Sequence, residues 1–347
     1  MKGEDMPLAP RFAYLVLGLA AVLGCATASA QTTTTDTATA DFNARCTAAG
    51  VVDCQGFDAS SVFTQAGGLN PIYGTTTYGG FQDTSVKMSG NSSLRFDIVD
   101  GTGADVAGSF TSNFSKTFSQ NSTFYVQFAA RFDSNFINTN WNAIAQTTPK
   151  LVDFYDGADT PCANIELTTV EWYTPALPTM YSECGARGLT ASTTNITSWQ
   201  STSQVPYLLQ QGTSTTDGYN CPYGQYTAGT GNGTGCLFYP ANTWVTFYYQ
   251  VSVGTWGQAN SSVQAWIIVN GVKKQWIDVR NYTLNSNGSS TGGFNKLMFT
   301  PYMTNKSSSV VYPTGHMWID ELVVSSQPIA APQSQPLPEP PGQVQVN

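Results

Sequence analysis

Two polar residues spaced four positions apart could together bind an acidic group. Gln127 and Arg131 lie in residues 124–132, where they alternate with apolar residues such as Val126 and Phe128. Because successive side chains of a strand point to opposite faces, Gln127 and Arg131 share one face and the apolar residues share the other. A guanidinium and an amide can both donate hydrogen bonds to a carboxylate. This strand is therefore predicted to contribute to a binding site.

Three further residues could transfer protons. Lys150, Tyr302 and His316, the only histidine of the chain, lie in or at the end of apolar segments. Lysine, tyrosine and histidine side chains all serve as general acids or bases. Structural alternatives stay open, namely a surface ion pair for Arg131, a hydrogen-bonded strand residue for His316 and packing at a strand end for Tyr302.

Aromatic and amide side chains share a face in two more segments. Tyr248 has the parity of Gln250, Gln264 has the parity of Trp266, and Trp318 lies near the end of the chain. Aromatic rings offer an apolar face with a polar tip, and amides both donate and accept hydrogen bonds. These five residues are candidates for sugar binding, and burial in the core is the alternative for the two tryptophans.

Two acids indicate a different chemistry. Glu166 and Glu171 lie five residues apart in residues 165–172, and a bulge between them would bring both to one face. The spacing resembles the Glu-x-Asp-x-x-Glu signature of retaining glucanases with a jelly-roll fold, in which one acid attacks the anomeric carbon and the other protonates the leaving group. Thr168 stands where that signature has its Asp. Without a bulge the two acids would lie on opposite faces.

Strand patterns recur along the chain and predict an all-β fold. Only 10% of the residues are charged and 12% are aromatic, which suits a β-rich exported domain. No stretch shows helical periodicity. The segments rich in aromatic and β-branched residues are 124–132, 150–155, 165–172, 244–253, 263–269, 272–279 and 296–302.

The segments around Asn270-Gly271 and the final predicted strand are the most informative. Asn270-Gly271 separates residues 263–269 from 272–279, and this dipeptide supplies the positive φ values of a tight hairpin turn. Residues 315–325 form the final predicted strand. In it His316, Trp318, Asp320 and Leu322 are expected on one face, with the intervening residues on the other.

The two ends of the chain differ in composition from the middle. Residues 1–30 have the basic start, short apolar run and small-x-small site of a signal peptide, so we expect a secreted protein, extracellular or periplasmic. Lipid anchoring at Cys25 is the weaker alternative. Residues 31–40 are predicted to be a Thr-rich linker, 41–327 a single β-jelly-roll domain, and 328–347 a Pro/Gln-rich disordered tail.

Removal of the signal would leave six cysteines, an even number that predicts disulfides in an exported chain. Sequential pairing closes the shortest loops, although six cysteines allow fifteen pairings. Metal binding is the weaker alternative because there is no Cys-x-x-Cys pair and no second histidine. The sequential pairs are Cys46 with Cys54, Cys162 with Cys184, and Cys221 with Cys236.

Charge and apolar patterning restrict the partners. The net charge of −8 argues against nucleic acid but leaves room for a local basic region that binds an acidic glycan. No segment is long enough to span a membrane, and we expect a monomer. No cofactor is required by these residues, although Ca²⁺ could be held by Asp156, Asp159 and Asp320.

Four segments together resemble concanavalin A-like secreted proteins related to polysaccharide lyases: FYVQF (124–128), LPTMY (177–181) with Cys184-Gly185 after it, NTWVTF (242–247) and WIDELVVS (318–325). The likeness spans most of residues 41–326. Over this range the sequence is similar to heparinase I-type, alginate and glucuronan lyases. It implies a β-jelly-roll sandwich of two curved antiparallel sheets that holds a glycan in its concave groove. Because these motifs are architectural, they imply the fold more directly than the activity.

The resemblance implies a set of roles. A lyase that cleaves a uronic-acid glycan by β-elimination must neutralise the carboxylate, remove the proton at C5 and protonate the leaving oxygen. Gln127 and Arg131 would serve the first task, and Tyr302, Lys150 or His316 the other two.

We therefore predict a polysaccharide lyase that acts on a uronic-acid glycan. Two alternatives stay open. One is a jelly-roll glycoside hydrolase that uses Glu166 and Glu171. The other is a non-catalytic glycan-binding module, in which stacking and hydrogen bonds alone hold the sugar.

Overall fold

The computed structural model describes most of the chain after the predicted signal peptide. The described residues belong to one compact unit, and none of their helices is long and apolar enough to cross a membrane. The predicted signal peptide, Cys25, Cys162, Cys184, Asp156 and Asp159 lie outside them. The described residues are 36–65, 68–74, 80–104, 107–142, 149–155, 166–171, 176–183, 208–209, 211–213, 215–221, 226–227, 232–233, 235–284 and 292–333.

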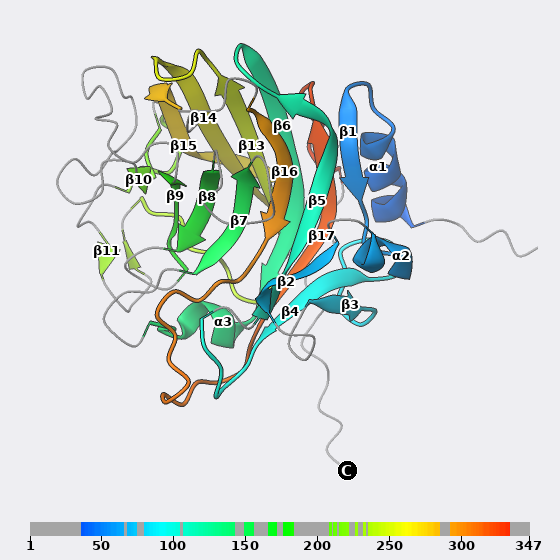
Figure 1. The fold of residues 1–347 in the computed structure, drawn as a ribbon, viewed down its shortest axis with the longest axis vertical. Coiled ribbons are helices and arrows are strands. Elements are labelled where there is room, and N and C mark those ends of the chain that lie inside the picture. The colour runs from blue at the N-terminus through cyan, green and yellow to red at the C-terminus, as the bar shows by residue number, and fades with distance from the viewer. Residues whose placement is uncertain are drawn as a thin grey trace, which may run out of the picture. The chain divides into compact units, whose positions relative to one another are not determined.

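Two antiparallel sheets form the body of the protein, as the sequence predicts for a jelly roll (Figure 1). The eight-stranded sheet has the order β15 (Val272–Thr283), β14 (Ala259–Val269), β13 (Val245–Val253), β6 (Ser122–Phe132), β17 (Gly315–Ser325), β4 (Ser93–Ile98) and β3 (Phe81–Asp83), and β1 (Val51–Gln55) also pairs with β17.

The seven-stranded sheet has the order β10 (Leu208–Leu209), β9 (Pro178–Glu183), β8 (Glu166–Glu171), β7 (Lys150–Tyr155), β16 (Phe294–Phe299), β5 (Ala107–Phe118) and β2 (Leu69–Gly74). A small separate hairpin pairs β11 (Tyr226–Thr227) with β12 (Asn232–Gly233). Three helices are described: α1 (Thr37–Cys46), α2 (Ser60–Thr64) and α3 (Ser134–Asn138).

The core lies between the two sheets and is rich in phenylalanine. Phe128 of β6 meets Phe299 of β16 edge to face, with ring centroids 4.9 Å apart. Val126, Phe247 and Ile267 are buried in the same cluster. The predicted strand parity is therefore confirmed on β6, β13 and β14, because these are the residues expected to face inward. The face of each sheet turned away from this core is called its outer face below.

The hairpin between β14 and β15 is also confirmed. Asn270 has φ of 50° and Gly271 has φ of 77°, the positive values that a tight turn of this kind requires. Val269 pairs with Val272 across the turn.

The predicted parity of the last strand is wrong beyond its midpoint. The register of β17 against β6 shifts between Asp320 and Val323, and Glu321 has φ of 52°. Such a bulge inserts one residue and exchanges the two faces of the strand. Leu322 consequently lies in the same core as Met317, whereas the unbroken alternation would put them on opposite faces.

Both predicted flanking segments are partly ordered on the outer face of the eight-stranded sheet. Residues 37–40 of the predicted linker begin α1, because the side chain of Asp36 accepts a hydrogen bond from Thr39 N at 2.7 Å and caps the helix. Residues 328–333 of the predicted tail are described, and Ile329 is buried with Phe42 of α1. The boundaries at 40 and 327 are therefore wrong by several residues. Sequence composition missed that the sheet itself orders these segments.

Two of the three predicted disulfides are confirmed. Cys46 pairs with Cys54 and joins the end of α1 to β1. Cys221 pairs with Cys236 and braces the segment before β13. The third predicted pair lies outside the described residues.

Candidate functional site

A row of three polar residues crosses the outer face of the seven-stranded sheet. Lys296 of β16 is the register partner of Asn113 on β5 and of Tyr155 on β7. Directly opposed residues on neighbouring strands bring their Cβ atoms to roughly 5 Å of one another. These residues, called the Tyr155 row below, therefore present an amide, an ammonium and a phenol side by side.

Strand parity explains why the row points away from the core. Phe154 and Leu297, the sequence neighbours of Tyr155 and Lys296, are buried between the sheets, so alternate residues face outward. The Nζ atom of Lys296 lies 5.9 Å from the centroid of the Tyr155 ring. Asn113 is exposed, whereas Tyr155 is only 6% exposed. The row thus runs from solvent into a largely dry part of the face.

The Tyr155 hydroxyl has a polar neighbour on the same face. Thr111, two residues before Asn113 on β5, has its hydroxyl 3.3 Å from the hydroxyl of Tyr155. Either oxygen can donate to the other. A hydroxyl in this position can stabilise negative charge on a phenol oxygen, because it can turn to donate.

The backbone register continues the row toward β8. Tyr155 pairs with Glu166, and the pairing of β8 with β9 is regular from Glu166 to Glu171. The register shift in this region lies on β7, between Lys150 and Val152. A strand without a bulge puts positions five apart on opposite faces. The backbone therefore lacks the bulge that the predicted Glu166 and Glu171 pair requires.

Two predicted proton-transfer residues lie at the seven-stranded sheet: Lys150 is the first residue of β7, and Tyr302 follows the end of β16. Lys150 is paired with Val170 of β8, which has the parity of Glu166, so Lys150 occupies a position on the same face as the row. Its backbone N–H donates to the carbonyl of Tyr302 at 2.9 Å. Lys150 and Tyr302 are thus neighbours at one end of the sheet that carries the Tyr155 row.

Gln127, by contrast, is enclosed on the outer face of the eight-stranded sheet. Its Oε1 accepts from Nη1 of Arg45 at 2.6 Å, and its Nε2 donates to the carbonyl of Ala330 at 3.0 Å. Arg45 also bonds Glu321 at 2.5 Å and Asp41 at 3.1 Å. Asp41, Arg45, Gln127 and Glu321 form the Arg45 network, in which Gln127 is 0% exposed. The amide of Gln127 is committed to holding α1 and the C-terminal segment on the sheet.

His316 lies elsewhere on the same outer face, among acids. Its Nδ1 is 2.5 Å from Oδ2 of Asp133, whose other oxygen caps α3 through Phe136 N at 2.6 Å. Its Nε2 lies 3.7 Å from Asp97, and its ring stacks on Trp318 with centroids 5.5 Å apart. His316 therefore connects β17, β4 and the start of α3.

Trp318 and Arg131 complete this region, called the His316 cluster below together with Asp83, Arg95, Asp97 and Asp133. Trp318 is 8% exposed and donates from Nε1 to Asp83 at 3.0 Å. The guanidinium carbon of Arg131 lies 5.8 Å from the Trp318 ring. The five predicted catalytic residues therefore divide between two sheets, and the roles predicted for Arg131 and His316 stay predictions.

Asp83 is held as an anion within the His316 cluster. Burial alone would raise its pKa, but hydrogen bonds from Trp318, Ser85 N and Arg95 outweigh burial and hold the pKa of Asp83 at about 2. Arg95 binds it at 2.7 Å and also binds Asp97 at 2.9 Å. The carboxylates of this region are thus paired within the fold.

Asp320, proposed above as a Ca²⁺ ligand, instead accepts hydrogen bonds from backbone N–H groups. It is 0% exposed, and its carboxylate accepts hydrogen bonds from Met88 N at 2.8 Å and Glu321 N at 2.8 Å. It therefore braces the bulge of β17. Among the described residues no three His, Cys, Asp or Glu side chains gather as they would around a metal ion.

Four predicted sugar-binding residues do share one face. Tyr248 is paired with Trp266, and Gln250 is paired with Gln264. Tyr248 is buried, and its hydroxyl accepts a hydrogen bond from Ile329 N at 3.2 Å. The other three residues are partly exposed. The expected grouping is thus present, but on the eight-stranded sheet and away from Lys150 and Tyr302.

The Tyr155 row was missed by sequence reasoning, although its signal was present. Lys296 and Tyr155 lie inside segments predicted as strands, and both alternate with apolar residues. Applying the same parity rule to residues 150–155 and 109–114 would have placed Tyr155 and Asn113 on outer faces. Cross-strand register, which joins them, requires the three-dimensional pairing.

The sequence matches no family model and no curated protein. Among solved structures, the chain is similar to a marine PL-14 alginate lyase from Aplysia kurodai, with 11% identity, coverage of 71% of this chain and 86% of that one, and a TM-score of 0.46. It is also similar to alginate lyase Aly36B, with 14% identity, coverage of 80% and 93%, and a TM-score of 0.44.

A third similar structure is an endo-β-1,4-glucuronan lyase from the fungus Trichoderma reesei, with 10% identity, coverage of 72% and 87%, and a TM-score of 0.41.

Proposed function

We propose that the protein is a polysaccharide lyase that cleaves a uronic-acid glycan by β-elimination on the outer face of the seven-stranded sheet. The observation that carries this proposal is the Tyr155 row, in which Asn113, Lys296 and Tyr155 are cross-strand neighbours. β-Elimination needs groups that neutralise a carboxylate and a group that moves a proton. The row contains both kinds within three adjacent strands.

Lys296 and Asn113 would bind the carboxylate of the uronate. The ammonium supplies a positive charge and the amide supplies a neutral donor. Their combined effect is to stabilise the negative charge that spreads onto the carboxylate when the C5 proton leaves. This role places the sugar ring above β16, next to Tyr155.

Tyr155 would move the proton. As a phenolate it removes the proton from C5, and the same oxygen then gives a proton to the glycosidic oxygen as the C4–O bond breaks. The products are a C4–C5 double bond and a new hydroxyl, and the phenolate is restored. The Thr111 hydroxyl at 3.3 Å would stabilise the phenolate between turnovers.

The hydrolase alternative has weaker support in the backbone. A retaining glycosidase needs two carboxyl groups about 5 Å apart on one side of the sugar. Glu166 and Glu171 occupy positions of opposite parity in a strand whose pairing with β9 is regular. No such objection applies to the Tyr155 row.

Export is part of the same proposal. It follows from the predicted signal peptide, and the two disulfides of the described chain are compatible with an oxidising compartment. A polysaccharide substrate would be met outside the cell.

The test is product analysis on alginate, glucuronan, heparin and a neutral β-glucan. We expect the absorbance of an unsaturated uronate to appear with an acidic glycan and to be lost in Tyr155→Phe. Tyr312→Phe is the matched control, since the Tyr312 hydroxyl has no hydrogen-bond partner among the described residues. New reducing ends without that absorbance would replace the lyase by a hydrolase.

A further inference from the structure

A second polar surface lies on the outer face of the eight-stranded sheet, across β13, β14 and β15. Gln250, Gln264 and Asp278 form one row in register. Ser252, Ser262 and Arg280 form the next row. The amides and hydroxyls of these rows are partly exposed, so this part of the sheet is not covered by α1 or the C-terminal segment.

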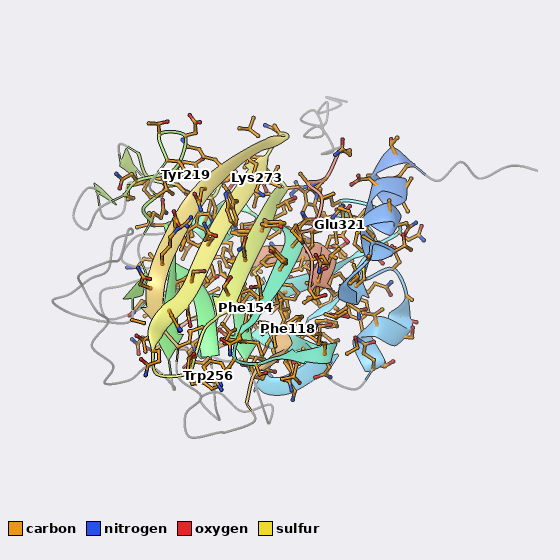
Figure 2. The ribbon with its side chains drawn as sticks, turned by 90° about the horizontal axis from the view of Figure 1, so that it is seen from above. Phe118, Phe154, Tyr219, Trp256, Lys273 and Glu321 are labelled. Carbon is orange, nitrogen blue, oxygen red and sulfur yellow. A yellow bond between two sulfur atoms is a disulfide. The ribbon has the colours of Figure 1, made fainter. Side chains whose placement is uncertain are left out.

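Lys273 stands at one end of this surface on a base of two aromatic rings. Its Nζ atom lies 4.0 Å from the centroid of the Tyr248 ring and 4.7 Å from that of Trp266. Figure 2 shows Lys273 beside the turn that joins β14 and β15. Such cation–π contacts hold the ammonium in one place without neutralising it. The loss of water around this ammonium lowers the pKa of Lys273, so an anionic ligand would favour its charged form.

Arg280 stands at the other end. Its Nε bonds the buried carboxylate of Asp278 at 3.0 Å, and the same oxygen accepts from Nε2 of Gln264 at 3.1 Å. Because Asp278 orients both donors, the surface presents positioned groups instead of mobile ones. The register partners of Lys273 and Arg280 on β14 are Ile268 and Ser262. Six residues of strand separate those partners by about 20 Å.

The arrangement suits an extended acidic polymer. Two cations about 20 Å apart match a ligand that carries repeated negative charges. The amides of Gln250 and Gln264 between them match hydroxyl groups. The chain as a whole has 14 basic and 22 acidic residues. On this surface the carboxylate of Asp278 pairs with Arg280 at 3.0 Å, so Lys273 contributes the charge that most favours an anion. A neutral sugar could accept hydrogen bonds from these cations but would not pair with their charge.

We propose that this surface is a second, non-catalytic binding site for an acidic polysaccharide, separate from the Tyr155 row. It is called the Lys273 surface and comprises Gln250, Gln264, Trp266, Lys273 and Arg280. The choice of a uronic-acid polymer rests on the proposed function. The Lys273 surface on the eight-stranded sheet would keep the enzyme attached to a long glycan, while the Tyr155 row on the seven-stranded sheet cleaves it.

The test measures binding of full-length mature protein to alginate and to a neutral β-glucan. Lys273→Gln and Arg280→Gln are each expected to weaken alginate binding by about tenfold, because each removes one side-chain cation that would bind the acidic glycan. Lys274→Gln is the matched control, since Lys274 makes the same kind of contact with Tyr219, at 4.1 Å, one residue further along. It is expected to change binding by less than about twofold, in line with ordinary surface substitutions.

The outcomes separate this site from the proposed activity. Cleavage of short soluble oligosaccharides should be unchanged in Lys273→Gln and Arg280→Gln. Equal weakening by all three variants, no weakening by any, or equally tight binding of the neutral glucan would overturn the second site. If the parent forms no unsaturated product yet Lys273→Gln still loses alginate binding selectively, the binding site stands and the lyase proposal falls.

Discussion

The outer faces of the two sheets use charged residues in different ways. On the eight-stranded sheet, Arg45 is bound to Glu321 and Asp41, and Arg95 is bound to Asp83 and Asp97. On the seven-stranded sheet, Lys296 instead has an amide and a phenol as its register partners. On the first face, ion pairs hold α1 on the sheet and join β3 to β4. On the second face, a lysine stands in register between two neutral polar side chains.

This difference shows why a polar face is a poor guide to a catalytic site. Gln127 has the parity of a groove residue, yet it is enclosed by α1 and the C-terminal segment. Figure 2 shows Glu321 close to α1, in agreement with its bond to Arg45. Covering an outer face with a helix needs buried polar partners, and these partners look like site residues in the sequence.

The largest effect is expected from removal of Arg45. Arg45→Ala leaves Glu321 buried without its cation, and losing one partner of a buried pair costs about 3–5 kcal/mol. Burial already raises the pKa of Glu321 despite the attraction of Arg45. Urea unfolding should report this loss in the free energy of unfolding, while activity per folded molecule stays unchanged.

The exposed Lys87→Ala is the control for Arg45 and should stay within about 0.5 kcal/mol of the parent. A loss of activity in Arg45→Ala that exceeds the loss of folded protein would show that this face takes part in catalysis. The contrast between the two faces would then fail.

Lys296→Met should produce the opposite pattern. Removing the cation of the Tyr155 row is expected to lower kcat/KM on the acidic glycan by about tenfold or more, which is about 1.4 kcal/mol of transition-state binding. The free energy of unfolding should change little, because the methionine keeps most of the side-chain stem. Lys116→Met, an exposed lysine on β5 of the same sheet, is the control. Equal activity of Lys296→Met and the parent would remove Lys296 from the mechanism.

The smallest effect concerns acid. The pKa of Asp83 in the fold is about 2, below its ordinary value of 3.8. Because this pKa is lower in the folded state than in the unfolded state, ionised Asp83 stabilises the fold at pH values above about 4. This stabilisation is lost as the pH falls from about 4 to about 2. Partial solvent screening leaves about 1 kcal/mol for this group.

Asp83→Asn should therefore reduce the loss of stability between pH 4 and pH 2 in thermal or urea unfolding. An identical pH dependence in Asp83→Asn and the parent would mean that Asp83 is not a determinant of acid stability. Activity near neutral pH should differ little between the two proteins.

Local patterns predicted much of the fold. The alternation in β6, β13 and β14 and the Asn270-Gly271 turn were read correctly because one strand determines its own parity. The bulge at Asp320 and Glu321 could not be read, since it depends on contacts with Met88 N and Arg45 from distant segments. Helix α1 was not predicted, because its short Thr-rich start has no strong helical periodicity.

The candidate site depended on knowledge that one strand cannot supply. Chemistry alone grouped the five predicted catalytic residues, yet β6 and β17 belong to one sheet and β7 to the other. The five are Gln127 and Arg131 on β6, His316 on β17, Lys150 on β7, and Tyr302 after the end of β16. Parity says which residues share a face of one strand, and only the pairing of strands says which faces meet. The Tyr155 row becomes visible when β5, β16 and β7 are placed side by side.

The most direct test of the account compares Tyr155→Phe with His316→Gln. Both variants remove one titratable group, and His316 is the strongest candidate on the other sheet. We measure kcat/KM on the acidic glycan from the absorbance of the unsaturated product, with the parent alongside. Loss of a positioned proton-transfer group should lower the Tyr155→Phe value by at least about a hundredfold, whereas His316→Gln should stay within about threefold of the parent. An inactive His316→Gln beside an active Tyr155→Phe would contradict the account and move the chemistry to the eight-stranded sheet.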